Sequence, residues 1–410
     1  MNSTIAKFIY WGILFGVCSN AVRIYFSQMD AQVIAEDEVY GWYFKLNYFG
    51  NVVLCACSIA SFFLYKKYFP SFINTCYILM ILAVTAASIP DFDKIFARPT
   101  FFFSIKGIGT YINFGLLYFV ADTERFPKVL KLFYYLCFAF IVAGFINLAQ
   151  VGLGASRREF MLTIKDLAFY CMWVFPYFFL QDEEDKKKNL INLAAFMLIV
   201  VLVFSTGARS YLIICALVLM IKFSKQLKSK NGVFAIIGML LLIGIGYVVL
   251  LNSEYSGTLE GAATNLSERS DQDTRSEQIL DFLGQYDMDY LVQGVGPKGT
   301  WYWHSIESKY EFLDNQFLLL AWWAGLPAIL IYLIFLVRSM FVKSEILLFQ
   351  NIKGVKLMIG LWIAACLGFA IYVTISSEPY YYFISFMIGI NACQYTKIWG
   401  EPEEFEEEAA

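Results

Sequence analysis

Long apolar runs separated by short polar segments are the sequence feature that most constrains how this chain can fold. Each run has roughly the 20 residues that a helix needs to cross a bilayer. The runs are continuous and lack the weak alternation typical of membrane β-strands. The sequence therefore predicts an all-α polytopic membrane protein, with about twelve transmembrane helices and one large extracytoplasmic loop. The predicted spans lie near 5–25, 43–65, 71–89, 100–120, 129–152, 161–180, 190–205, 208–223, 232–251, 314–337, 355–374 and 380–397.

The composition agrees with a membrane protein and excludes several other classes. Of the 410 residues, 59% are apolar and 16% are charged. An ordinary soluble domain is about 45–50% apolar and about 25% charged. This balance excludes a cytosolic enzyme and a disordered chain. The net charge of −3 provides no basic excess to hold a phosphate backbone, so no nucleic-acid partner is expected.

The residue types that commonly bind metals are poorly represented in the polar segments. All nine cysteines lie in apolar stretches, where a thiol behaves as a small hydrophobic group. The single histidine, His304, cannot form a metal site alone. We therefore expect no metal site.

The positions of Lys and Arg predict how the spans are oriented, because cytoplasmic loops carry an excess of these residues. With the N-terminus in the cytoplasm, the clusters at 66–67, 186–188 and 222–230 all fall on the cytoplasmic side. The segment 27–40 then falls outside, and it contains four acidic residues and neither Lys nor Arg. Both termini are therefore predicted to be cytoplasmic.

The same pattern divides the chain into four parts. We expect an N-terminal transmembrane bundle (1–251), a large periplasmic loop with short helices (252–312), C-terminal transmembrane helices (313–398) and an acidic tail (399–410).

One short helix within the loop can be predicted from its start signal. Thr274 and Glu277 have the spacing of a capping box, in which both side chains serve the first turn of a helix. An apolar stripe with helical spacing follows, which predicts an amphipathic helix beginning near residue 274. The stripe consists of Ile279, Leu280, Leu283 and Tyr286.

Four arginines lie on the side of the membrane where this orientation leaves few cations: Arg157, Arg158, Arg209 and Arg275. The guanidinium group is a planar fork that binds two phosphate oxygens at once. Arg209 also sits between two apolar spans, where a charge is costly and usually serves a function. Simpler alternatives remain open. Arg157 and Arg158 can pair with Glu159, and Arg209 can extend to lipid headgroups.

Two further residues are candidates for proton transfer. His304 lies in an aromatic part of the loop, either as a general base or as an ordinary interfacial residue. Asp314 precedes the tenth span, either as a helix N-cap or as a base at the membrane face.

Four short motifs follow one another in the second half of the chain. They are Ser205-Thr206-Gly207-Ala208-Arg209-Ser210 between two spans, Arg275-Ser276-Glu277-Gln278-Ile279-Leu280, Gly294-Val295-Gly296-Pro297, and Asp314-Asn315-Gln316-Phe317-Leu318 running on to Ala324-Gly325-Leu326-Pro327. Their order and placement over residues 190–337 resemble the Wzy-type O-antigen polymerase and O-antigen ligase superfamily.

This resemblance implies a metal-independent glycosyltransferase of surface-polysaccharide (lipopolysaccharide) biosynthesis at the periplasmic face of the bacterial inner membrane. It implies undecaprenyl-diphosphate-linked glycans as substrates, membrane lipids as surroundings, a chain-length regulator as a further partner, and no cofactor. Carried over by position, Arg209 and Arg275 would bind the lipid diphosphate, with Arg157 and Arg158 as weaker candidates. Asp314, or His304 in its place, would act as the base.

Three functions stay open on these grounds. A polymerase joins one lipid-linked repeat unit to another, whereas a ligase transfers the polymer to the lipid A core. Ligases tend to carry His where this chain has Asp314, which favours the polymerase. The alternative from another class is a repeat-unit flippase or other transporter, for which about twelve spans are also typical. The absence of an internal repeat argues against it.

Overall fold

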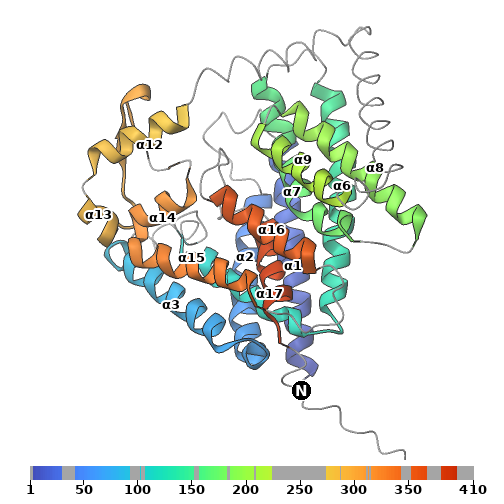
Figure 1. The fold of residues 1–410 in the computed structure, drawn as a ribbon, viewed down its shortest axis with the longest axis horizontal. Helices are drawn as coiled ribbons and strands as arrows, with labels where there is room; N and C mark the ends of the chain where they lie inside the picture. The colour runs from blue at the N-terminus through green and yellow to red at the C-terminus, as the bar shows by residue number, and fades with distance from the viewer. Residues whose placement is uncertain are drawn as a thin grey trace, which may run out of the picture.

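The computed structural model describes residues 3–29, 42–92, 102, 107–151, 157–181, 185–206, 209–223, 274–286, 288–310, 313, 315–342, 352–366 and 380–394. These residues form a predominantly helical protein (Figure 1). The first half comprises α1 (Ser3–Met29), α2 (Trp42–Tyr65), η1 (Lys66–Tyr68), α3 (Ser71–Ser88), η2 (Ile89–Asp91), α5 (Ile108–Ile112), η4 (Asn113–Ala121), α6 (Phe126–Val151), α7 (Arg157–Phe179), α8 (Lys186–Ser205) and α9 (Arg209–Phe223). The second half comprises α12 (Thr274–Gln285), α13 (Met288–Gln293), β1 (Trp301–Trp303), η6 (His304–Ile306), β2 (Ser308–Tyr310), α14 (Gln316–Ala324), α15 (Leu326–Met340), α16 (Ile352–Cys366) and α17 (Tyr380–Ala392).

Five of the described helical segments are long and apolar enough to cross a membrane. They are Thr4–Phe26, Trp42–Tyr68, Ser71–Asp91, Phe126–Gln150 and Lys186–Ser205, and each matches a predicted span. Shorter apolar helices occur at Ile108–Ala121, Tyr211–Phe223, Leu326–Met340, Gly354–Ala364 and Tyr382–Ala392. The predicted span 232–251, the first part of the loop (252–273) and the acidic tail lie outside the described residues.

Small residues set the close packing of α1 against α2. Gly12 and Gly16 form a Gly-x-x-x-Gly pair on α1, and Gly50 of α2 lies against Gly16. A Cβ at Gly12 would overlap the Cys57 thiol, and one at Gly50 would overlap the Ser19 side chain. In a bilayer, where apolar burial drives association weakly, such close contact of backbones is a main source of helix pairing.

The predicted span 100–120 is not one regular α-helix where the structure describes it. The single α-helical turn of α5 runs into η4, a buried 3₁₀ helix that packs against α2 and α17. At Gly115 the two backbones approach so closely that a Cβ would lie 2.8 Å from the Ser58 carbonyl oxygen. The 3₁₀ coil is narrower than an α-helix, which is compatible with this close approach.

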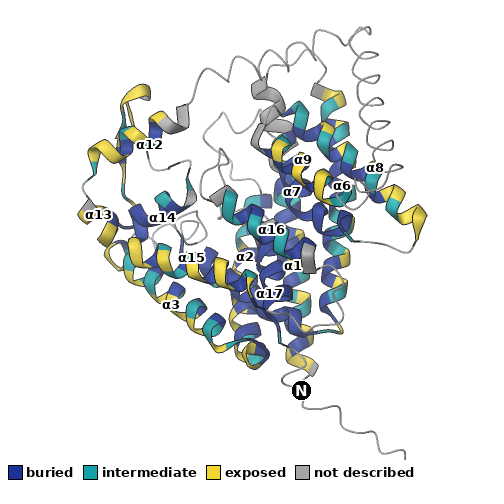
Figure 2. Cartoon of the chain, in the orientation of Figure 1, coloured by how far each residue is buried: buried dark blue, intermediate teal, exposed yellow. Residues whose placement is uncertain are grey.

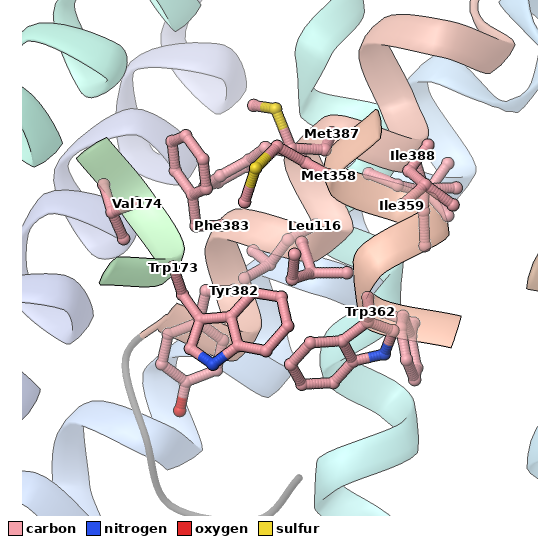
Figure 3. Packing of buried hydrophobic residues seen from close by; sticks show 14 of the residues in the cluster. Leu116, Trp173, Val174, Met358, Ile359, Trp362, Tyr382, Phe383, Met387 and Ile388 are labelled. Atoms are coloured by element: carbon pink, nitrogen blue, oxygen red, sulfur yellow. The ribbon is translucent and has the colours of Figure 1, made fainter. Parts of the chain in front are cut away.

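Aromatic side chains fill the space between the central helices. Trp173 of α7 meets Trp362 of α16 edge-on, with ring centroids 5.2 Å apart. Figure 3 shows this pair beneath Met358 and Phe383, which come from α16 and α17. The burial map agrees, since α7 and α17 are buried along most of their described length whereas α3 and α8 keep an exposed side (Figure 2).

The predicted span 314–337 is divided into two helices. Gly325 ends α14 and precedes α15, with φ +85° and ψ 165°. Only glycine adopts this backbone conformation without strain. A continuous helix here was therefore a wrong prediction, although the Gly-Leu-Pro sequence at 325–327 carries the signal for a break.

Several helix ends meet at one end of the bundle. The Tyr65 hydroxyl donates to Asp122 Oδ2 (2.9 Å), and Arg125 forms an ion pair with the same oxygen (3.1 Å). This joins the end of α2 to the start of α6. The Gln394 N–H donates to the Tyr68 carbonyl (2.8 Å), which brings the end of α17 to the same place.

Further cations gather at this end. Arg338, in the last turn of α15, lies over the Phe72 ring at 5.5 Å. Lys222, near the end of α9, donates to the Gln181 carbonyl just after α7 (2.7 Å). Phe178, near the end of α7, contacts Tyr134, near the start of α6, with ring centroids 5.1 Å apart. The ends of α7 and α9 therefore lie at the same end of the bundle as the start of α6. Figure 1 shows the N-terminus on this side and α12 on the opposite side of the molecule.

Candidate functional site

The described part of segment 252–312, which the sequence predicts to be a large loop, is a small folded unit placed on α14. Helix α12 packs against the antiparallel hairpin β1–β2, in which Trp301 pairs with Tyr310. The buried ring of Phe282 contacts Trp301 and Trp322 edge-on, each with ring centroids 5.6 Å apart. An aromatic core therefore fixes this unit to α14.

Helix α12 is described from Thr274, near which the sequence predicts a helix to begin. Its buried face differs from the predicted apolar stripe, because Gln278 and Phe282 are buried while Leu280 is 70% exposed and Leu283 is 43% exposed. Ile279 and Tyr286 of the predicted stripe are half-buried, so the prediction was wrong for Leu280 and Leu283 only. The buried face is shifted because the hairpin, which the sequence pattern did not reveal, packs against the neighbouring face of the helix.

The turn at Gly294–Pro297 locks the loop to the end of α14. Gly294 and Gly296 have positive φ (79° and 83°), and a turn follows at 297–298. The N–H groups of Val295 and Gly296 donate to the carbonyls of Trp322 and Trp323 (2.8 and 3.0 Å). These carbonyls at the C-terminus of α14 need such partners because the helix stops at Gly325.

A second contact ties the turn to the N-terminal half of the chain. The Lys298 N–H donates to Asp91 Oδ2 (3.3 Å), so the end of α3 lies beside the loop. Asp91 is itself buried. The loop therefore lies at the end of α3, on the side opposite the end of α2, where Tyr65 and Arg125 both contact Asp122.

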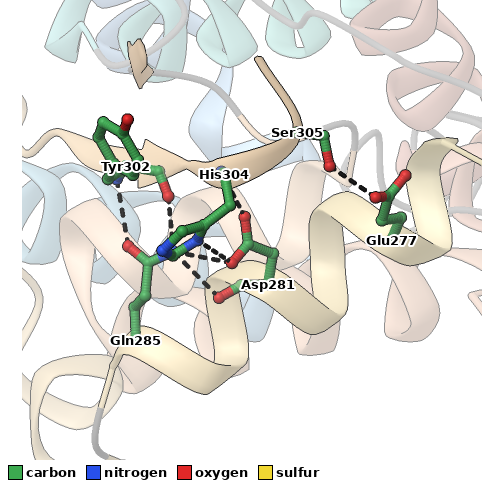
Figure 4. A network of polar contacts seen from close by, with 6 residues as sticks. All are labelled: Glu277, Asp281, Gln285, Tyr302, His304 and Ser305. Atoms are coloured by element: carbon green, nitrogen blue, oxygen red, sulfur yellow. Dashed lines mark hydrogen bonds and ion pairs between the residues drawn. The ribbon is translucent and has the colours of Figure 1, made fainter. Parts of the chain in front are cut away.

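Three polar side chains of α12, spaced four residues apart, hold the hairpin (Figure 4). Gln285 accepts from the Tyr302 N–H (3.2 Å) and donates to the Tyr302 carbonyl (2.5 Å). Glu277 accepts from the Ser305 hydroxyl (2.6 Å). Asp281, between them, binds His304.

Two separate contacts join Asp281 to His304. Asp281 Oδ2 accepts from the His304 backbone N–H (2.8 Å), and Asp281 Oδ1 lies 2.6 Å from His304 Nδ1. Because a carboxylate only accepts hydrogen bonds, this distance places a proton on Nδ1. The ring is 67% exposed, whereas the Asp281 side chain is only 18% exposed.

The charge of Asp281 is stabilised by the same contacts. Partial burial raises the pKa of its carboxyl, but hydrogen bonds from the His304 backbone, the His304 ring and the Gln285 amide outweigh this effect. The pKa therefore lies below its ordinary value, and Asp281 is a carboxylate at neutral pH.

The four predicted diphosphate ligands all fall in the first turn of a helix. Arg157 and Arg158 are the first two residues of α7, Arg209 is the first residue of α9, and Arg275 is the second residue of α12. Their side chains lie outside what the structure describes, so the alternatives of pairing with Glu159 and of reaching headgroups stay untested.

Asp314 lies outside the described residues, but the structure settles which neighbour caps the following helix. Asn315 is the N-cap of α14, and its Oδ1 accepts from the Leu318 N–H (2.9 Å). The prediction that Asp314 is this N-cap was therefore wrong. Its alternative role as a base is untested.

Sequence reasoning missed Asp281, Gln285 and Tyr302 as neighbours of His304. One signal was present, since Glu277, Asp281 and Gln285 form a polar stripe at i, i+4 and i+8. Their partner could not be identified without the hairpin. Within the described ranges, no group of three or more His, Cys, Asp or Glu side chains is placed to hold a metal ion.

No protein-family model and no curated protein matches this sequence.

Proposed function

We propose that this protein is an O-antigen polymerase, a membrane glycosyltransferase that joins undecaprenyl-diphosphate-linked repeat units at the periplasmic face of the inner membrane. The observation that carries the proposal is the coincidence of the predicted diphosphate-binding arginines with helix N-termini. Three separate helices, α7, α9 and α12, each begin on or beside one of these arginines.

An arginine in the first turn of a helix is electrostatically unfavourable. The helix dipole places about half a positive charge at the N-terminus, and a nearby cation works against it by about 0.3–1 kcal/mol. An anion at the same place reverses the sign, because it interacts with the N–H groups and with the guanidinium. In α9 the first turn contains Arg209 and no acidic residue. A phosphate group suits such a position.

The contacts between helix ends support a topology with the loop outside. If α1, α2 and α3 each cross the membrane, the end of α3 lies on the side opposite the N-terminus. Lys298 contacts Asp91 at that end, whereas Gln394 contacts Tyr68 at the cytoplasmic end. The cations Lys66, Lys67, Arg125, Lys222 and Arg338 then collect on the cytoplasmic side, as the positive-inside rule requires.

The reaction that follows is a displacement at the anomeric carbon of the growing glycan. A hydroxyl oxygen of the incoming lipid-linked unit forms a bond to that carbon, while the bond from the carbon to the diphosphate oxygen breaks. The undecaprenyl diphosphate leaves with the electron pair, and its negative charge is stabilised by Arg209 and Arg275. The hydroxyl proton passes to a base, for which His304 and Asp314 are the candidates.

The deletion phenotype tests this function against both alternatives. Loss of a polymerase leaves single repeat units on the lipid A core, and restoring the gene restores the ladder of long chains. Loss of a ligase instead leaves uncapped core and accumulated lipid-linked polymer. Loss of a flippase leaves no exported repeat unit. Either of the last two results contradicts the proposal.

A pair of cysteine variants tests the proposed sidedness. Lys309 is exposed on β2, and the Glu124 side chain is 69% exposed at the opposite end. In intact spheroplasts, a membrane-impermeant maleimide is expected to label Lys309→Cys at once and Glu124→Cys only after permeabilisation. The unsubstituted protein serves as background, because its described cysteines lie in apolar helices. The reverse pattern would require the loop to be cytoplasmic.

A further inference from the structure

The most organised polar site on the described surface of the loop is the exposed ring of His304. It is bound by Asp281 and lies beside Tyr302, whose ring centroid is 5.2 Å away in an edge-on arrangement. All three residues come from the unit formed by α12 and the hairpin, so their positions are set by one compact fold (Figure 4).

We propose that this group is the acceptor side of the glycosyl-transfer site, in which His304 Nε2 takes the proton from the attacking sugar hydroxyl. Asp281 is a positioning residue that holds the ring, and Tyr302 is a stacking surface for the acceptor sugar. This inference rests on the proposed polymerase function. It also assigns the role of base to His304 in preference to Asp314.

The first argument is the state of the ring. The carboxylate of Asp281 holds a proton on Nδ1, so whenever the ring carries one proton its lone pair is on Nε2. The hydrogen bond from the His304 backbone N–H to the other carboxylate oxygen fixes the orientation of the pair. A neutral ring with a defined tautomer is the form that accepts a proton, as in other carboxylate–histidine pairs.

The second argument is access. The His304 side chain is 67% exposed while its partner Asp281 is largely covered, so the free edge of the ring faces outward. A pair that served only to hold the hairpin would not need an exposed ring, because Gln285 and Glu277 already hold the two sides of the turn.

The third argument is the chemistry of the neighbours. Tyr302 is 41% exposed and presents an aromatic surface next to the proposed base. Aromatic rings bind the apolar faces of sugar rings. The acceptor class is therefore the non-reducing-end sugar of a lipid-linked repeat unit.

In this step, the hydroxyl oxygen of the acceptor sugar bonds to the donor's anomeric carbon as its O–H bond breaks. The proton moves to Nε2, which forms an imidazolium stabilised by the Asp281 carboxylate. The electron pair of the broken anomeric bond leaves with the undecaprenyl diphosphate. No oxidant, reductant or co-reactant is needed.

The single histidine allows a direct test that does not depend on activity. The full chain, labelled with ¹⁵N-histidine and placed in lipid nanodiscs, has one imidazole to observe. We expect neutral His304 to carry its proton on Nδ1. Asp281→Asn should shift the population toward the Nε2–H tautomer, and Glu277→Gln, one turn away on the same helix, should leave it unchanged. A wild-type Nε2–H tautomer, or an equal effect of Glu277→Gln, would overturn the pairing.

Polymerisation in membrane vesicles, with endogenous lipid-linked repeat units as substrate, tests the roles. His304→Gln should lower kcat by about 10²–10⁴-fold, the usual contribution of a general base. Asp281→Asn should lower kcat with little change in KM. Tyr302→Ala should raise KM by roughly threefold to tenfold, and Tyr302→Phe should restore it.

The outcomes separate the two levels of the proposal. Normal kcat in His304→Gln, together with the polymerase deletion phenotype, would overturn the role of His304 while the proposed function stands. A flippase or ligase phenotype would overturn the function, and with it this inference, even if the NMR signals show the expected tautomer.

Discussion

Gly325→Ala is expected to destabilise the protein by about 3 kcal/mol. The backbone at this position has φ +85° and ψ 165°, a conformation that strains an L-residue by about 1–3 kcal/mol. An added Cβ would also lie 2.7 Å from the Val292 carbonyl oxygen and 3.0 Å from the Gln293 carbonyl. Both contacts are with backbone atoms, which cannot rotate away as a side chain can. The thermal unfolding midpoint of the detergent-solubilised protein should fall by several degrees.

Gly284→Ala is the matched control for this substitution. Gly284 lies inside α12, and a Cβ there would meet no atom within 4 Å. Alanine favours a helix interior over glycine by up to about 1 kcal/mol, so this variant should be neutral or slightly more stable. An equal loss of stability in both variants would contradict the assigned conformation of Gly325.

Arg209→Ala and Arg275→Ala are each expected to abolish long polymer while the protein still reaches the membrane. Removing one donor from a site that stabilises a developing anion lowers kcat by about 10²–10³-fold. The product should therefore collapse to single repeat units, as in the deletion strain. Arg→Lys at the same positions should retain part of the activity, because the charge remains but the bidentate fork is lost.

The measurement is the chain-length ladder, scored beside the amount of protein in the membrane fraction. Lys309→Ala is the matched control, since Lys309 is an exposed cation on β2 of the same loop. It should leave the ladder unchanged. Normal ladders from both arginine variants would remove the support for a diphosphate site.

The features that sequence predicted well are those with a local cause. The five helical segments that are long and apolar enough to cross a membrane needed only length and hydropathy. Helix α12 could be located because its predicted start signal, Thr274 to Glu277, lies within one turn. The break at Gly325 was missed because apolar residues continue on both sides of it. The 3₁₀ segment η4 depends on close packing against α2, which no local pattern reports.

In the candidate site, too, only the residues with a local signal could be predicted from the sequence. His304 could be singled out because it is the only histidine, and the arginines because they oppose the expected charge distribution. The partner of His304 could not be predicted, because Asp281 is 23 residues away in the chain and contacts His304 only when the hairpin packs on α12. Asn315 capped α14 in place of Asp314, a choice between adjacent residues that backbone angles decide.

The hydrogen bond between Asp91 and Lys298 has a consequence for how the protein is made. The two residues are 207 positions apart in the chain. At a translation rate of about 5–20 residues per second, the end of α3 waits about 10–40 s after synthesis before its partner emerges. The N-terminal helices must therefore enter the membrane and stay folded there without this hydrogen bond. Closing the loop onto α3 is then a late step of biogenesis, after the intervening helices have been inserted.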